Sequence, residues 1–361
     1  MAAAITRSIR EGSFAPTQAL PSYADLAARH GVGIRTVRTA MDLLEREGLV
    51  RREAWRGVFI RQAPPRSTPS PAKAIKSVTL VGMSLHDGNP FPINDWLAAH
   101  SNALERRGIR MRYVIYWGHE DWVAEELVNK GAAGGEGCIL LGNAHAGLVR
   151  DLVSHGVPCV VQCYARYSLE GMVPHPRVFV NKYKGACDAV EYLAGLGHRR
   201  IGFLGGTPAG PYGGPGLQIY EGYCAALLRL GLEPRQEETA HVHTQEPEVA
   251  MAQARTILDK APRPTALLCG NDAAAVGAIR AAEAMGLRVP QDLSVMGFDN
   301  ASWLDPAKVP LTTVSIPRRL LSESAVELLL DVVAGKAAAD ESRVLECDLV
   351  VRGTTAPPAA S

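Results

Sequence analysis

The chain has 361 residues, of which 47% are hydrophobic, and its 38 Lys and Arg almost balance its 37 Asp and Glu. This length is sufficient for two or three domains. No N-terminal apolar export segment and no apolar run of about 18 residues occurs, so the sequence argues against secretion and membrane spanning and predicts a cytoplasmic protein. The seven cysteines show no CxxC pattern and no metal-like spacing with histidine, which argues against a disulfide or zinc scaffold and predicts reduced core thiols.

The charge is distributed unevenly along the chain. Residues 1–61 carry ten Arg, no Lys and six Asp or Glu, a balance of +4, whereas the whole chain has a net charge of +1. A basic, arginine-only head on a mildly acidic body favours a local contact with nucleic acid.

The head contains two predicted helices joined by a glycine turn, after an opening helix over residues 1–12. Ser22 and Asp25 have the spacing of a capping box, which predicts a helix over residues 23–30 that ends at Gly31. A second helix is predicted over residues 34–47 and ends at Gly48. Its buried stripe has helical spacing and consists of Val37, Ala40, Met41 and Leu44.

Two short runs with alternating apolar residues follow, over 49–52 and 58–61, and predict a β-hairpin. Two helices and a hairpin describe a winged helix-turn-helix. Arg35 and Arg38 lie in the first turn of the second helix, where a cation opposes the helix dipole. Arginine at that place suits a helix that enters the DNA major groove, and Arg56 at the hairpin tip suits a minor-groove or phosphate contact.

The stretch resembles the DNA-binding domain of the GntR family of bacterial regulators, through LPS, DLA, TVR, L-x-x-EGLV and the RG-x-F of the wing. The family usually has Glu-Arg where this chain has Tyr23-Ala24, and Arg where it has Ile34, so the usual family operator is not implied. The resemblance assigns residues 1–62 to DNA binding. The expected contacts are Ser22, Tyr23, Arg35, Thr36, Arg38, Arg56 and Gly57. The alternative is a winged helix that binds only protein.

A linker with four prolines occupies residues 63–73 and marks a domain boundary, with the linker region as a whole at 63–76. From Ser77 onward, short apolar strands alternate with amphipathic helices, which predicts an α/β fold with parallel sheets, in two lobes. The strand candidates are 78–82, 110–116, 137–141, 158–162, 177–180, 200–204, 239–243, 265–269 and 293–298. The helix candidates include 93–107, 183–196, 217–230, 247–260 and 272–285.

Polar residues follow several of these strands, at the edge where ligands bind in such folds. Asn271 and Asp299 come directly after apolar strands, and Asn89 and Phe91 follow the first strand. Asn and Asp with nearby aromatic rings suit a polyhydroxylated ligand. Asn271 has an equally good structural interpretation as the cap of the following helix.

Residues 77–358 resemble the effector domain of the LacI/GalR repressors, through LGHRRIGFLGG, EGYCAAL, PTALLCGNDAAAVGAI and LSVMGFDN. The resemblance implies a periplasmic-binding-protein-like fold of type I, a homodimer, and effector contacts from Asn271 and Asp299. The NPF segment that holds Asn89 and Phe91 fits the family's first loop. The family usually has an Arg where this chain has Ile219, so the usual sugar anchor is missing.

No nucleophile, general base, metal or cofactor motif stands out, so we expect no enzyme activity, no cofactor and no metal. The prediction is a cytoplasmic, homodimeric DNA-binding transcription regulator, most simply a repressor, that binds double-stranded operator DNA and a sugar-like effector between its lobes. The alternatives are a constitutive regulator with a vestigial effector cleft, a solute-binding protein that does not bind DNA, and an enzyme on the two-lobed fold.

Overall fold

A computed structural model of the chain describes most of the molecule. The described residues are 20–46, 50–53, 57–60, 75–83, 93–116, 121–132, 135–142, 146–163, 173–207, 217–242, 246–305 and 307–359. The predicted opening helix over residues 1–12 and the proline-rich linker over 63–73 lie outside these ranges.

The N-terminal part has the predicted helix-turn-helix and hairpin. Its elements are α2 (Tyr23–His30), α3 (Ile34–Arg46), β1 (Val50–Glu53) and β2 (Gly57–Ile60), and the two strands pair antiparallel. Gly31 ends α2 with a φ of 63°, a left-handed conformation that favours glycine. The predicted stripe is buried: Val37, Met41 and Leu44 are completely covered, together with Leu26 of α2.

Lobe 1 is a six-stranded sheet in the order β13-β7-β6-β5-β3-β4, with every neighbouring pair parallel. Two helices contact each face: α4 and α11 pack together on one, and α5 and α6 on the other. The bounds are β3 (Ser77–Met83), α4 (Ile93–Glu105), β4 (Arg110–Tyr116), α5 (Asp121–Ala132), β5 (Glu136–Leu141), α6 (Ala146–Ser154), β6 (Cys159–Cys163), β7 (Arg177–Val180), α11 (Arg318–Val333) and β13 (Ser342–Leu345).

Lobe 2 is a second six-stranded sheet in the order β14-β12-β11-β10-β8-β9, in which only β14 runs antiparallel to its neighbour. The helices α7 and α8 cover one face, and α9 and α10 cover the other. The bounds are α7 (Lys182–Gly195), β8 (Ile201–Gly205), α8 (Leu217–Arg229), η2 (Gln236–Glu238), β9 (Thr239–His241), α9 (Pro247–Leu258), β10 (Ala266–Cys269), α10 (Asp272–Ala284), β11 (Ser294–Asp299), β12 (Thr312–Ser315) and β14 (Asp348–Val350).

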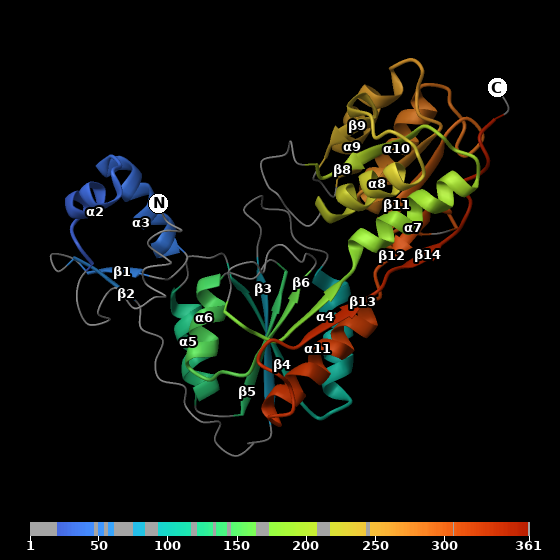
Figure 1. Ribbon diagram of the computed structural model, residues 1–361. Coiled ribbons are helices and arrows are strands. Elements are labelled where there is room, and N and C mark those ends of the chain that lie inside the picture. The colour runs from blue at the N-terminus through green and yellow to red at the C-terminus, as the bar shows by residue number, and fades with distance from the viewer. Residues whose placement is uncertain are drawn as a thin grey trace.

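The chain passes between the lobes three times, at what we call the interlobe crossings. The first crossing is Asn181, between β7 and α7; the second is Ile316–Pro317, between β12 and α11; the third is Glu346–Cys347, between β13 and β14. As a result α11 and β13 lie with lobe 1, although they follow lobe 2 in the sequence (Figure 1). One hydrophobic core runs continuously from lobe 1 to lobe 2.

The predicted α/β class with two lobes and parallel sheets is confirmed, and the predicted strands and helices agree with the structure to within a few residues at each end. The strand candidates from the sequence do not include β12, β13 and β14, and the helix candidates do not include α5, α6 and α11. β13 and β14 are short edge strands without fully buried positions, which leaves little apolar signal. Among the described residues, no helix is long and apolar enough to cross a membrane.

Candidate functional site

The first candidate site is the exposed face of α3. The helix α2 that precedes it is capped as predicted: the Ser22 hydroxyl accepts a hydrogen bond from the Asp25 N–H at 3.2 Å, and Asp25 Oδ2 accepts one from the Ser22 N–H at 3.2 Å. This reciprocal capping fixes where α2 begins and, through the Gly31 turn, how α3 follows it. Ser22 therefore has a structural role in the turn.

The first turn of α3 presents basic and polar side chains to solvent. Arg35, Thr36 and Arg38 are exposed, and so is Ile34 at 51%. The first turn contains no acidic residue to offset the two cations, and the Thr39 hydroxyl donates to the Arg35 carbonyl. The surface has the chemistry of a major-groove contact, in which guanidinium groups reach phosphates and guanine edges.

The remaining predicted DNA contacts are placed differently. Tyr23 is half-buried and packs against the hydrophobic core of the winged part, so its ring also has a packing role. Gly57 opens β2 and pairs with Glu53 of β1. Arg56 lies outside the described residues.

The second candidate site is the carboxyl edge of the lobe 2 sheet. Its strand order reverses between β8 and β10, and a crevice at such a switch point is where open α/β sheets bind ligands. Gly205 ends β8 and Gly270 follows β10, and the two backbones lie close together, since a Cβ built on either glycine would come within 3.1 Å of the Cα of the other. Asn271 comes next in the chain and therefore lies at this switch point.

Asn271 caps α10, as the structural interpretation of the sequence predicted. Its side-chain oxygen accepts a hydrogen bond from the Ala274 N–H at 2.7 Å. The side chain is only half-buried, so capping and ligand contact are compatible. Its assignment to an effector stays a prediction.

Asp272, the next residue, is a buried carboxylate that also follows the strand directly but was not among the predicted effector contacts. It is 2% exposed, and it accepts hydrogen bonds at 2.6 Å from the Thr313 hydroxyl and at 2.6 Å from the Ala301 N–H. Burial, together with the nearby negative charge of Asp299, raises the pKa of Asp272 to about 7. Asp272 thereby joins α10 to β12 and to the loop that follows β11.

Asp299 ends β11 at the same edge of the sheet. Its φ is 107° and that of Asn300 is 50°, and both values are unusual for residues other than glycine. Such strained conformations persist where the surroundings determine them, often at functional sites. Burial raises the pKa of Asp299, whereas the positive charges of Lys182 and Arg318 oppose that rise.

Lys182 and Arg318 were not predicted as site residues. Lys182 is 7% exposed, and burial lowers the pKa of its ammonium group. A lysine as the first residue of α7 opposes the helix dipole, and the same argument that drew attention to Arg35 could have identified it. The arrangement brings two cations and two carboxyl groups together at one edge of lobe 2.

Ile219 is placed away from solvent. It is 1% exposed in α8 and belongs to the core that contains Phe203 and Tyr223. An effector contact from this side chain stays a prediction, and its packing shows a structural role. Asn89 and Phe91 lie outside the described residues, so no geometry is assigned to them.

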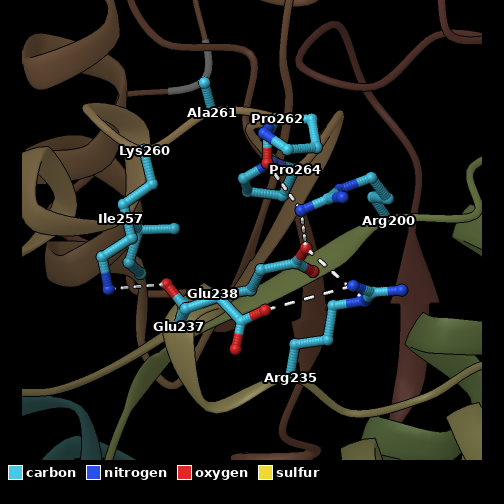
Figure 2. Close-up of a pocket in the computed structure, with 9 residues that line it drawn as sticks. All are labelled: Arg200, Arg235, Glu237, Glu238, Ile257, Lys260, Ala261, Pro262 and Pro264. Carbon is cyan, nitrogen blue, oxygen red and sulfur yellow. Dashed lines mark hydrogen bonds and ion pairs between the residues drawn. The ribbon is translucent and has the colours of Figure 1, made fainter.

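A separate cavity of about 330 Å³ lies at the opposite, amino edge of the lobe 2 sheet (Figure 2). The Glu238 carboxylate pairs there with Arg200, and with Arg235 at 3.9 Å, while Lys260 donates to the Glu237 carbonyl at 3.1 Å. The two arginines of this cavity form ion pairs with its two glutamates, and we assign no ligand to it. No group of three or more His, Cys, Asp or Glu suited to a metal occurs in the part of the chain that the structure describes.

Both the N-terminal region and the two-lobed region of the chain match known protein families. Residues 1–60 match the gntR family of bacterial regulatory proteins, and residues 190–355 match the periplasmic binding protein-like domain. The HTH-type transcriptional repressor CytR of Escherichia coli (strain K12) is 37% identical over 182 residues, which cover 50% of this chain and 52% of CytR. An uncharacterized HTH-type transcriptional regulator from the aml 5' region of Streptomyces limosus is 34% identical over 245 residues, 66% of each chain.

The solved structures show the same fold. A regulatory protein of LacI family from Chloroflexus aggregans matches with a TM-score of 0.65 at 24% identity, over 76% of this chain and 98% of that one. The match spans about half the length of CytR. The protein joins a gntR-family region at its N-terminus to a periplasmic binding protein-like domain.

Proposed function

We propose that this protein is a DNA-binding transcription regulator, acting as a repressor, whose state is set by a small molecule bound to its two-lobed domain. The observation that carries the proposal is the exposed Arg35, Thr36 and Arg38 surface at the start of α3, in a helix-turn-helix with a two-stranded wing. The gntR-family match over the same region supports it.

The proposed division of labour assigns residues 1–62 to operator DNA, 63–76 to a linker and 77–358 to effector binding and dimerisation. A dimer would place two winged heads on a pseudo-palindromic operator, with half-site spacing set by the lobes. The proposed setting is the cytoplasm, in contact with chromosomal DNA. The effector proposed is a sugar or a sugar derivative, because carboxylate and amide oxygens at the lobe 2 edge accept hydrogen bonds from hydroxyl groups.

The proposed regulation is a shift in population between two lobe arrangements. An effector changes DNA binding only if it binds one arrangement more tightly than the other. The proposed change acts through the spacing of the two heads.

The experiment is to incubate the purified full chain with sheared genomic DNA and to sequence the DNA that it retains. Retention of a few sites with inverted half-sites is expected, together with its loss in Arg35→Ala/Arg38→Ala. The matched control is Arg106→Ala/Arg229→Ala, which removes the same charge from side chains that are 59% and 57% exposed in the two lobes. Equal retention by both double variants, or uniform retention across the genome, would contradict sequence-specific binding through α3.

The second candidate is a regulator that acts constitutively, with a vestigial effector site. The observation in its favour is Ile219, which provides no polar anchor and packs in the core. Asp299→Ala would discriminate: unchanged regulation in cells would support the constitutive form, whereas a change in regulation would support effector control.

A further inference from the structure

Two cations lie at the starts of the helices that follow the first and second interlobe crossings. Lys182 is the first residue of α7, and Arg318 is the first residue of α11. Neither place suits a cation by itself, because the N-terminus of a helix carries a partial positive charge. A buried ammonium group has a further desolvation cost, so Lys182 requires a negative partner nearby.

The two cations contact the residues on either side of Asp299. Lys182 Nζ lies 5.8 Å from the centroid of the Phe298 ring, and Arg318 donates to the Asn300 carbonyl at 3.2 Å. Asp299 is therefore flanked by a cation from each of two crossings, and both cations act electrostatically on its carboxylate. The Nε atom of Arg318 is buried without a hydrogen-bond acceptor among the described residues.

The Asn300 side chain extends this connection. Its Nδ2 donates to the Ser315 hydroxyl at 3.2 Å, and its Oδ1 accepts from Arg352 at 2.9 Å. Ser315 is the last residue of β12, immediately before the second crossing. The loop that follows Asp299 is thus attached to the second crossing through the contacts of Asn300 with Arg318 and Ser315.

The first and third crossings are themselves joined. The Asn181 N–H donates to the Leu345 carbonyl at 2.9 Å, and Asn181 Nδ2 donates to the Glu346 carboxylate at 3.2 Å. Cys347 lies in the third crossing, where burial raises the pKa of its thiol, the charge of Lys182 opposes that rise and the charge of Asp299 adds to it. A change at Asp299 therefore has a physical route to all three crossings.

The geometry points to Lys182 and Arg318 as positioning residues for the Asp299 carboxylate, which connect the effector edge of lobe 2 to the interlobe crossings. The assignment of the effector to Asp299 rests on the proposed function. When the hydroxyl groups of a ligand donate hydrogen bonds to the Asp299 carboxylate, the carboxylate interacts less strongly with Lys182 and Arg318. The starts of α7 and α11 are then held less firmly at the crossings. Ligand binding and lobe orientation are then coupled through one partly buried charge cluster.

The test is hydrogen exchange of the purified full chain, read by mass spectrometry, without DNA or effector. In Lys182→Met we expect exchange to become about tenfold faster or more at residues 298–301 and also at 316–321, the second crossing, because Asp299 loses one of its two cations. Lys182→Arg keeps the positive charge and is expected to keep most of the protection from hydrogen exchange.

A matched control comes from a neighbouring exposed cation. Lys184→Met removes the same charge two residues away, from a side chain that is 52% exposed. We expect exchange in this control to change only within its own helical turn. Faster exchange in Lys182→Met that stays confined to α7, or that Lys184→Met reproduces at 316–321, would overturn the proposal.

A double variant separates the coupling from a general loss of stability. Lys182→Met/Asp299→Asn leaves no buried charge unpaired between these two residues and keeps the chain foldable where the single variant fails. We expect its exchange at 316–321 to be no faster than that of the more affected single variant, whereas independent structural roles would add. Additive effects would contradict the proposal. Because no DNA is used, this outcome is separate from that of the genomic DNA experiment.

Discussion

The Asp272 carboxylate occupies the space that a side chain on Gly297 would need. A Cβ on Gly297 would overlap Asp272 Oδ1 and would also come within 2.9 Å of a methyl group of Leu311. Gly297 lies in β11 opposite Thr313 of β12, whose hydroxyl donates to the same Oδ1 at 2.6 Å. The absence of a side chain at Gly297 is therefore what allows α10 to place a carboxylate against two strands of lobe 2.

Replacement of Gly297 by alanine is expected to destabilise the protein. The methyl group would displace the Asp272 carboxylate and lengthen its hydrogen bond to Thr313, at a cost of about 1–3 kcal/mol in the free energy of unfolding. Urea unfolding followed by circular dichroism measures it. Gly147→Ala is the control, because its Cβ in α6 meets no atom within 4 Å. We expect Gly147→Ala to be neutral or to stabilise by up to about 1 kcal/mol. Equal stability of Gly297→Ala and the parent chain would contradict the steric argument.

Asp272 also predicts an unusual dependence of stability on pH. Its pKa is raised from 3.8 to about 7, so the folded protein binds this proton more tightly than the unfolded chain does. Stability from this group is present at low pH and is lost as the pH rises from about 4 to about 7. At about 1.4 kcal/mol for each pKa unit, a difference of about 3 pKa units between the folded and unfolded chain gives a loss of about 4 kcal/mol.

Asp272→Asn is expected to remove that loss, because an amide does not ionise. The difference in free energy of unfolding between the variant and the parent chain should therefore increase in favour of the variant from pH 5 to pH 8. Asp292→Asn is the control, since the pairing of Asp292 with Arg288 lowers its pKa to about 2, below this range. A parallel pH profile for Asp272→Asn and the parent chain would show that Asp272 is ionised throughout.

Substitutions at Ile219 test whether this side of α8 faces the core or a ligand. Since Ile219 is 1% exposed in the core, Ile219→Arg is expected to bury an unpaired guanidinium. The expected cost is about 3 kcal/mol or more, with a lower midpoint of thermal unfolding. Ile219→Leu, which keeps the hydrocarbon, should cost less than about 1.5 kcal/mol. If Ile219→Arg were as stable as the parent chain, the position would face open space, and an effector contact there would be restored to consideration.

The helix-turn-helix was predictable almost to the residue, because local signals determine it. The capping box at Ser22, the left-handed glycine at Gly31 and the stripe that includes Val37 each act within one turn of chain. The α/β alternation of the lobes was equally clear, since buried parallel strands are nearly continuous apolar runs.

The charge cluster of lobe 2 was only half predictable. Asp299 was identified because it follows a strand, but Lys182 and Arg318 follow different strands, one of which was not predicted. Their meeting depends on the three crossings, which bring residues far apart in sequence to one place. Local sequence patterns do not report contacts between residues that are far apart in the chain. The only local signal at Lys182 is an unfavourable positive charge at the start of a helix.

His100 provides a last prediction, on the acid side of the pH range. It is fully buried in α4, with Nδ1 2.7 Å from the Trp96 carbonyl and Nε2 2.9 Å from the Gln162 side-chain oxygen. Burial lowers the pKa of His100 below 6.5, so its contribution to stability is present above pH 6.5 and is lost as the pH falls through the lowered pKa.

Gln162→Glu places a carboxylate beside Nε2 of His100 and favours the charged ring. We therefore expect this variant to retain more of its stability between pH 6.5 and pH 5 than the parent chain does, in urea unfolding at both pH values. Gln236→Glu, at an exposed position, is the control and should follow the parent chain. A Gln162→Glu variant that loses as much stability as the parent chain over this interval would show that His100 does not determine the acid limb.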